Sequence, residues 1–311
     1  MDNDVDKFDS LTTRASLHVH LDGAVEPETL MELDPSLTRA EIDQATTYSD
    51  FAGFLESFVW VNRRLRTPED YARVARRLFE TLSSQGVVYA EVTLSVGVVL
   101  WKQLPFAPIY DALLRETARS PIKVRWIFDA IRQFGPETAK PVFDLAAERV
   151  NEGVVAIGLG GDEVRGPALP FRDLFREARD KGLRLVCHAG ETTGPKSVWD
   201  ALEIGAERIG HGIRSIDDPA LVAHLAARRI PLEVCITSNL RTGAVASLER
   251  HPVKKLYAAG VPIILDTDDP ALFGCTLNGE YELAAREFGF SEAQMAEIAR
   301  NSIEFAFAAN W

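Results

Sequence analysis

Leu265-Asp-Thr-Asp-Asp-Pro270 is the stretch of the sequence from which the fold can be worked out. It closes the apolar run Val261–Leu265, which has the composition of a buried strand. Pro270 cannot continue that strand, so the adjacent carboxylates Asp268 and Asp269 lie at its end. Two like charges side by side in such a place are costly unless a cation or a polar ligand uses them. The stretch therefore predicts a site at the carboxyl end of a buried strand.

Seven more segments have the pattern of strands, and helical patterns separate most of them. Repeated strand–helix units with glycine-marked turns predict a parallel sheet, and eight units predict a closed (β/α)8 TIM barrel. A doubly wound sheet would need a glycine-rich phosphate turn, and Gly158–Glu163 has a glutamate where the last glycine belongs. The eight expected strands are Ser16–His20, Val87–Leu94, Lys123–Asp129, Val154–Leu159, Arg184–His188, Glu207–Gly210, Pro231–Ile236 and Val261–Asp266.

The interval between the first two strands is about twice as long as one strand–helix unit needs. We expect residues 24–86 to form a helical lid over the carboxyl ends of the strands, where barrel enzymes keep their sites. A stabilising appendage without a role at the site is the alternative. The whole chain, residues 1–311, is expected to be one domain, with residues 1–14 as a disordered tail.

Composition limits the classes of partner. The net charge of -12 argues against nucleic acid and acidic membrane surfaces and leaves a small-molecule substrate. Three cysteines without paired spacing suit a reducing compartment. The sequence shows no signal peptide and no membrane span, so a cytoplasmic protein is expected. It gives no indication of oligomeric state.

Four of the six histidines fall at expected strand ends. His18 and His20 are two residues apart, so on a strand they point to the same side. His188 and His211 end later strands. We expect a metal site of three imidazoles and one carboxylate, a ligand set that zinc favours when one position stays open for water. The remaining histidines, His224 and His251, are expected on the surface, and Cys187 in the core.

The missing motifs narrow the type of site. The sequence lacks the His-Glu-x-x-His helix of common metalloproteases and the Pro-Cys-x-x-Cys motif of cytidine-deaminase zinc sites. No lysine stands at a strand end where it could bridge two metals. One metal ion is therefore expected, rather than two.

Six motifs together resemble the adenosine deaminase family in order and spacing. The resemblance covers the chain from about residue 16 to Phe307. It implies a zinc-dependent barrel hydrolase that converts a 6-aminopurine nucleoside to its 6-oxo form and releases ammonia. The motifs are Ser16-Leu-His-Val-His-Leu-Asp-Gly23, Gly160-Gly-Asp-Glu163, His188-Ala-Gly-Glu191, Gly210-His-Gly212, Thr237-Ser-Asn239 and Asp266-Thr-Asp-Asp-Pro270.

The resemblance also assigns roles to the residues of these motifs. His211 would take a proton from the zinc-activated water and orient the hydroxide toward C6. Glu191 would donate a proton to N1, which requires a raised pKa. Asp269 would hold N7 and the attacking water, the backbone N–H of Gly161 would reach N3, and Asp22 would bond a ribose hydroxyl. The ligands of a single zinc ion would be His18, His20, His188 and Asp268. Gly160-Gly161 also fits an ordinary tight turn, with Asp162 and Glu163 as turn and cap residues.

Two departures from the common family pattern concern the far end of the substrate. The stretch Thr93–Trp101 keeps Ser95 for the pocket wall but replaces the usual residues around it. In the lid, a helix over Val59–Arg66 would place Trp60, Arg63 and Arg64 on one face, with Trp101 and Lys102 opposite. Both features are similar to the branch that deaminates 6-aminodeoxyfutalosine in menaquinone biosynthesis, whose substrate carries a benzoate beyond the ribose.

Several alternatives remain open at the level of sequence. They are an adenosine deaminase proper, an adenine deaminase of purine salvage, a non-catalytic nucleoside-binding relative and an unrelated barrel metallohydrolase. The non-catalytic relative is disfavoured because binding alone needs neither His211 nor Glu191.

Overall fold

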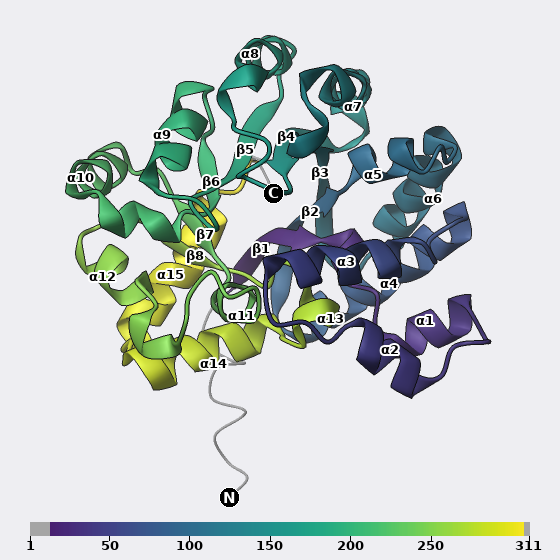
Figure 1. Cartoon of the computed structure of the whole chain (residues 1–311), viewed down its shortest axis with the longest axis horizontal. Coiled ribbons are helices and arrows are strands. Elements are labelled where there is room, and N and C mark those ends of the chain that lie inside the picture. The colour runs from purple at the N-terminus through teal and green to yellow at the C-terminus, as the bar shows by residue number, and fades with distance from the viewer. Residues whose placement is uncertain (1–12, 308–311) are drawn as a thin grey trace, which may run out of the picture.

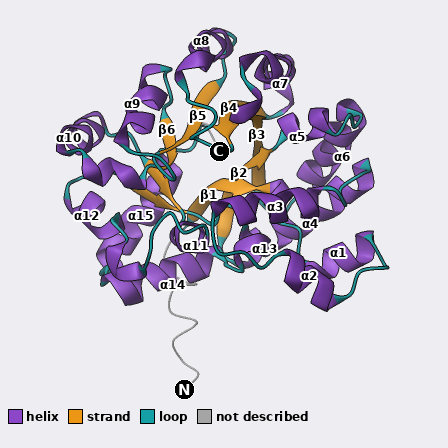
Figure 2. Ribbon diagram, in the orientation of Figure 1, coloured by secondary structure: helices purple, strands orange, loops and turns teal. Residues whose placement is uncertain are grey.

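The computed structural model describes residues 13–307, and a barrel of eight parallel strands forms its centre. The strands follow one another around the barrel in chain order, and the helices surround them (Figure 2). The predicted (β/α)8 TIM barrel is confirmed. The strands are β1 Arg14–His20, β2 Val87–Leu94, β3 Lys123–Ile131, β4 Val154–Gly160, β5 Arg184–Ala189, β6 Arg208–His211, β7 Leu232–Val234 and β8 Ile263–Leu265. The helices are α1 Pro27–Leu33, α2 Arg39–Ala45, α3 Phe51–Asn62, α4 Pro68–Ser84, α5 Val96–Trp101, α6 Phe106–Arg119, α7 Pro136–Glu148, α8 Arg172–Asp180, α9 Pro195–Glu203, α10 Pro219–Arg228, α11 Ile236–Arg241, α12 Val253–Ala258, α13 Pro270–Phe273, α14 Leu277–Phe288 and α15 Glu292–Glu304.

The residues that follow β8 close the barrel against β1. An isolated parallel bridge joins Val19 to Asp268. The carboxylate of Asp266 accepts hydrogen bonds from the backbone N–H groups of Leu17, at 2.6 Å, and His18, at 2.9 Å. A buried carboxylate here replaces part of a strand ladder, because it satisfies N–H groups that would otherwise be unpaired.

Two expected strands are shorter in the structure. The run Pro231–Ile236 is a strand only over Leu232–Val234, because Ile236 begins α11. The carboxylate of Glu280 accepts the N–H of Ile236 at 2.8 Å and that of Thr237, which stabilises the start of this helix. Likewise β8 ends at Leu265, before the Asp266 carboxylate turns to β1.

The expected lid at residues 24–86 contains four helices, but α4 belongs to the barrel. It packs on β2 and α6 through buried residues such as Tyr71, Val74 and Leu78. The additional segment is therefore α1 to α3. In Figure 1, α1 and α2 project at one side of the barrel and α3 lies beside β1. Arg14, which was expected in a disordered tail, is buried and begins β1; residues 1–12 of the expected tail lie outside the described residues.

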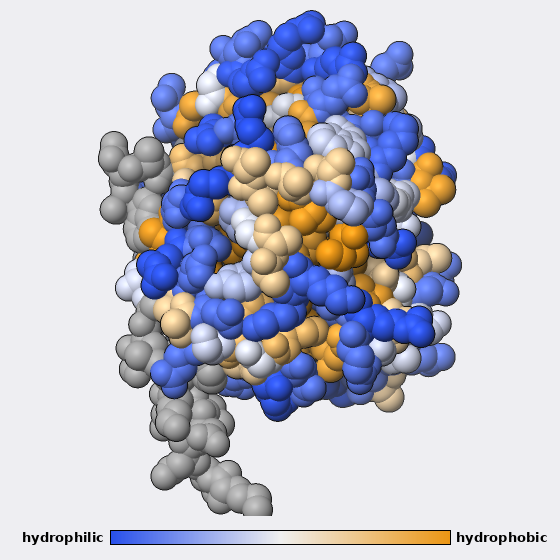
Figure 3. Space-filling model, turned by 90° about the vertical axis from the view of Figure 1, so that its left-hand side faces the viewer, coloured by the Kyte–Doolittle hydropathy of each residue, from blue (hydrophilic) through white to orange (hydrophobic). Residues whose placement is uncertain are grey.

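Hydrophilic residues cover much of the face shown in Figure 3, with hydrophobic groups between them. Within residues 13–307, no helix combines the length and the apolar character that crossing a membrane requires.

Candidate active site

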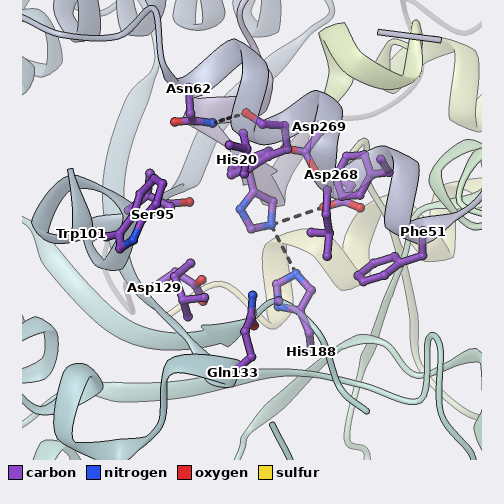
Figure 4. Close-up of a pocket in the computed structure, with 18 of the residues that line it drawn as sticks. His20, Phe51, Asn62, Ser95, Trp101, Asp129, Gln133, His188, Asp268 and Asp269 are labelled. Atoms are coloured by element: carbon purple, nitrogen blue, oxygen red, sulfur yellow. Dashed lines mark hydrogen bonds and ion pairs between the residues drawn. The ribbon is translucent and has the colours of Figure 1, made fainter. Parts of the chain in front are cut away.

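A cavity lies at the carboxyl ends of the strands, between the barrel and α3. It measures about 1060 Å³ with its open mouth included. Polar side chains from the strand ends line one part, and apolar side chains of α3 and α5 line the other. The lining residues that matter below are His20, Phe51, Phe54, Phe58, Asn62, Arg63, Ser95, Trp101, Asp129, Gln133, Phe134, Gly161, His188, Glu191, His211, Asp268 and Asp269 (Figure 4).

Imidazole and carboxylate atoms meet at the deep end of the cavity. The Nε2 atom of His20 lies 3.3 Å from Nε2 of His188 and 3.3 Å from Oδ1 of Asp268 (Figure 4). His18 Nε2 lies 3.4 Å from the same Asp268 oxygen. A ligand atom from each of His18, His188, His211 and Asp268 lies within 4.8 Å of the others. Five side chains from four strand ends therefore surround one point.

Glu233 of β7 orients one of these imidazoles. Its Oε2 lies 2.8 Å from Nδ1 of His18, so that ring nitrogen donates to the carboxylate and Nε2 presents its lone pair to the cavity. Nε2 has no hydrogen-bond partner among the described residues although it is buried. Arg208 forms an ion pair with Glu233 from beneath and also with Glu91, at 2.7 Å. This buried group of charges fixes the His18 ring from the barrel interior.

The pKa values fit a site that takes up a cation. Burial lowers the pKa of His20 to about 4 and that of His188 well below its usual range, so both rings are neutral at pH 7. Burial also lowers the pKa of His18, but the nearby carboxylates of Asp268 and Glu233 outweigh that effect and raise it. Cation binding would therefore displace a proton from His18.

A chain of hydrogen bonds fixes the tautomer of His211. The Val253 N–H donates to Nδ1 of His251 at 3.3 Å, so the neutral His251 ring carries its hydrogen on Nε2. That Nε2 donates to the Asn239 side-chain oxygen at 3.2 Å, and the Asn239 amide nitrogen donates to Nδ1 of His211 at 3.1 Å. His211 therefore carries its own hydrogen on Nε2, on the side of the cavity. An imidazole in this form donates a hydrogen bond and offers no lone pair there.

The tautomers separate His211 from the other three histidines. His18, His20 and His188 can each direct a nitrogen lone pair to the centre, whereas His211 directs an N–H. Three histidines and the Asp268 carboxylate, the set expected from the sequence, are therefore the candidate ligands of a metal, although the four ligand atoms that lie closest together include His211 in place of His20. The backbone is left-handed at two residues of the cavity: φ is +60° at His211 and +62° at Asp268. Such conformations cost about 1–3 kcal/mol each and are typical of functional sites.

Glu191 lies beside His211 and is held by its own loop. Its Oε2 lies 3.7 Å from Nε2 of His211. Burial, together with the charges of Asp268 and Glu163, raises the pKa of Glu191 well above its usual range. Glu163 accepts the backbone N–H groups of Gly190, Glu191 and Thr192 at 2.8–2.9 Å. Glu163 is thus a buried positioning residue for the loop that carries Glu191, not an ordinary turn residue.

Asp269 is the second carboxylate of the pair that ends β8. Burial and the neighbouring Asp268 charge raise its pKa well above the usual range. Its Oδ1 is buried without a partner among the described residues. A Cβ atom at Gly23 would come within 1.7 Å of that oxygen, so only glycine leaves room for it. Asp269 is therefore a buried carboxyl at the edge of the cavity, in surroundings that favour its protonated form.

The expected sugar contacts are only partly in place. Ser95 lines the cavity, but its backbone N–H donates at 3.0 Å to the Oδ2 atom of Asp22. Asp22 is fully buried and is not among the residues that line the cavity. Gly161 does line it, with φ +97°, a conformation that favours glycine. The structure thus places Gly161 and Ser95 at the cavity and Asp22 behind its wall.

The lid residues differ from the expected arrangement. The helix α3 ends at Asn62, not at residue 66, so Arg63 caps it and lines the cavity. Trp60 and Arg64 line a separate outer hollow, where the guanidinium lies 3.5 Å from the centre of the indole ring. Only Arg63 of the three expected residues faces the cavity.

Other residues supply the aromatic surface that was expected from Trp60. Trp101 and Phe134 are 54% and 44% exposed, and their ring centroids lie 6.5 Å apart at the mouth of the cavity. Lys102, also expected here, lines the cavity but donates from Nζ to the carbonyl groups of Asn62 and Leu65. It therefore holds the end of α3 in place.

Several partners of these groups are not evident from the sequence. His251 was expected on the surface and is only 4% exposed, because it lies behind Asn239. His224 is half-buried beside the Trp199 ring. The one sign of Glu233 in the sequence is its charge within the apolar run of a strand. Asn239 stands out only as part of the motif Thr237-Ser-Asn239.

Comparisons with known proteins agree with this geometry. Residues 13–310 match the family model described as adenosine deaminase. An aminodeoxyfutalosine deaminase of Streptomyces coelicolor is 41% identical, over 98% of this chain and 82% of its own. An adenosine deaminase of Klebsiella pneumoniae is 35% identical, over 96% of this chain and 95% of its own. Among solved structures, an amidohydrolase of Burkholderia ambifaria with bound Zn is 29% identical and has a TM-score of 0.91, over 100% of this chain and 89% of that one.

Proposed function

Since the chain belongs to the adenosine deaminase family, we propose that it is a zinc-dependent deaminase of a purine nucleoside extended beyond its ribose, of the 6-aminodeoxyfutalosine type. The coarser statement is established: the protein is a hydrolytic deaminase that acts on C–N bonds of adenosine-type substrates. The single observation that carries the finer proposal is the shape of the cavity. It has a polar deep end and a wide aromatic mouth with one arginine.

The residues at the deep end fit a divalent metal ion. His18, His20, His188 and Asp268 would hold it, and the buried, unpaired Nε2 of His18 supports this assignment. Three nitrogens and one carboxylate oxygen suit zinc, and a related structure contains Zn. When bound, the metal would act as a Lewis acid and lower the pKa of its bound water, so that hydroxide is available near neutral pH.

The other side chains provide donors around the purine ring. A protonated Glu191 would donate to N1, and a protonated Asp269 would donate to N7; the raised pKa of each carboxyl supports these roles. The hydrogen on Nε2 of His211 would hold the attacking oxygen toward C6. The tautomer supports this orienting role and not the proton uptake that the family resemblance implied, because the nitrogen that faces the cavity is already protonated. Water and the 6-amino group thus give the 6-oxo product and ammonia.

The mouth of the cavity suits an aromatic carboxylate at the far end of the substrate. Trp101 and Phe134 offer exposed aromatic faces, and Phe58 of α3 adds a third apolar ring. Arg63 lies on the same cavity and can bind a carboxylate through two N–H groups. Adenosine alone would leave this surface uncovered. We therefore propose a place in menaquinone biosynthesis, and the three free cysteines support a reducing cytoplasm as its compartment.

Steady-state kinetics on adenosine, adenine and 6-aminodeoxyfutalosine test the proposal. The wild type should have the highest kcat/KM for 6-aminodeoxyfutalosine. Arg63→Ala should lower that value by about 10–100-fold, as loss of a charged hydrogen bond does, and leave adenosine unchanged. Arg64→Ala is the matched control, because Arg64 lies on the outer side of the lid. A wild type that prefers adenosine or adenine, or equal effects of both arginine variants, would refute the tail-binding role.

A further inference from the structure

Asp129, at the carboxyl-terminal part of β3, is a buried acid of the cavity that the mechanism above does not use. It is 3% exposed and lines the cavity. Its Oδ1 atom has no hydrogen-bond partner among the described residues. Burial raises the pKa of this carboxyl to about 8. An unpaired polar atom in such a place is unfavourable, so a partner is expected from the ligand.

The neighbouring strand is shaped around this carboxyl group. Gly158 and Gly160 of β4 stand beside it in the ladder with β3. A Cβ atom at Gly158 would lie 2.6 Å from Oδ1, and one at Gly160 would lie 2.9 Å from Oδ2. Any larger residue at either position would displace the carboxyl. The two glycines therefore leave space for a side chain that forms no ion pair within residues 13–307.

The position of Asp129 places it at the sugar side of the substrate. Figure 4 shows it between Ser95 and Gln133, across the cavity from His20 and His188. Its strand partner is Gly158, but its carboxyl group lies against Gly160, which is followed directly by Gly161, the residue proposed to face N3 of the purine. The sugar is attached at N9, next to N3, so a group beside Gly161 meets the sugar rather than the amino end of the ring.

We propose that Asp129 binds the hydroxyl groups of the substrate's ribose and is a specificity-determining residue of this deaminase. The inference rests on the proposed function. A carboxyl group can accept from a hydroxyl or, when protonated, donate to one, so it suits a sugar in either state. The role differs from the expected one for Asp22, which lies behind the wall and already accepts the N–H of Ser95.

The test compares substrates with and without the hydroxyls. The kcat/KM of adenosine and 2′,3′-dideoxyadenosine is measured with wild type, Asp129→Ala and Asp129→Asn. Asp129→Ala should lower the value for adenosine by about 10–100-fold and leave that for dideoxyadenosine nearly unchanged. Asp129→Asn, which keeps one acceptor oxygen, should lie between wild type and Asp129→Ala. Asp173→Asn, an exposed acid of α8, is the control and should match the wild type.

Two results would overturn the inference: an equal fall for both substrates, or no fall for adenosine. If the wild type deaminates neither compound, binding tests the role of Asp129 instead, and the proposed function fails only if 6-aminodeoxyfutalosine is not deaminated either. Titration calorimetry of the zinc-loaded protein with inosine and 2′,3′-dideoxyinosine should then show a preference for inosine that Asp129→Ala removes. Equal binding of the two by the wild type would refute the role of Asp129.

Discussion

The backbone N–H of Asp268 donates to the carbonyl oxygen of His18 at 3.0 Å, and the side chains of the same two residues meet at the deep end of the cavity. The contact between Asp268 and His18 therefore both closes the barrel and brings the side chains of the site together. A second bond, from the His20 N–H to the Asp268 carbonyl at 2.8 Å, adds the third group. Backbone hydrogen bonds, and not flexible side chains, set the distances between His18, His20 and Asp268. A metal site requires this kind of preorganisation.

The first prediction concerns metal content. The purified protein should contain about one equivalent of zinc, and His188→Ala should lose most of it, because three ligands remain and one of them is shared with Ser238. Elemental analysis measures this. His224→Ala, at a half-buried histidine of α10 that lies beside Trp199 and does not line the cavity, is the control and should keep the metal. Full zinc occupancy in His188→Ala would mean that the ligand set is wrong.

The second prediction separates chemistry from folding at Glu191. Glu191→Gln keeps the shape and the hydrogen bond from Thr242 but cannot donate an acidic proton. The rate should fall by about 10²–10⁴-fold while zinc content and Tm stay near the wild-type values. Turnover within a few-fold of wild type would remove Glu191 from the reaction.

The fold, and the meeting of His18, His188 and Asp268 at one place, could be predicted because their signals are local. Strand ends are marked by glycine or proline, and His18, His188 and Asp268 each stand beside such an end. The carboxyl ends of parallel strands meet at one face of the barrel, so these residues had to converge once the fold was known.

The partners of these groups could not be predicted, since they depend on contacts between distant segments. Glu233 reaches His18 across 215 positions of sequence, and His251 reaches Asn239 from a different turn. The prediction for the lid residues was wrong for another reason. Trp60 and Arg64 do share one face, as their helical spacing predicted, but packing turns that face to the outer hollow and leaves only Arg63 at the cavity.

The third prediction concerns the charges beneath the site. Glu233→Ala removes one partner from a fully buried group and leaves the Arg208 guanidinium with Glu91 alone. The free energy of unfolding should fall by about 3–5 kcal/mol, as measured by chemical denaturation. Glu304→Ala breaks an exposed pair with Arg229 and should cost no more than about 1 kcal/mol. Similar losses in the two variants would show that the buried group does not stabilise the barrel.

The fourth prediction follows from the raised pKa of Asp129 and applies to the protein after removal of its metal by a chelator. The pKa is about 8 in the folded chain and near its usual value of 3.8 in the unfolded chain. The protonated carboxyl is thus favoured by the fold, and its contribution is complete below pH 3.8 and is lost as the pH rises through 8. Asp129→Asn should therefore gain stability relative to wild type from pH 5 to pH 8. A difference in Tm that does not change with pH would contradict it.

The fifth prediction tests whether His251 fixes the tautomer of His211. Since His251 lies behind Asn239 and does not line the cavity, His251→Phe should leave zinc content and KM near wild type. It frees the Asn239 amide to turn, so that its oxygen can face Nδ1 of His211 and the hydrogen on Nε2 is lost. The kcat should then fall by roughly 10–100-fold, the range found for residues that orient a group in a metal site. His251→Gln can still donate to the Asn239 oxygen, and it should recover much of the rate. The pH dependence of kcat gives a second measure. A His211 ring with a free Nε2 takes up a proton as the pH falls. The acid limb of the kcat profile should therefore move to higher pH in His251→Phe. A fall in kcat of the same size in both variants, with an unchanged pH profile, would show that His251 only packs the core.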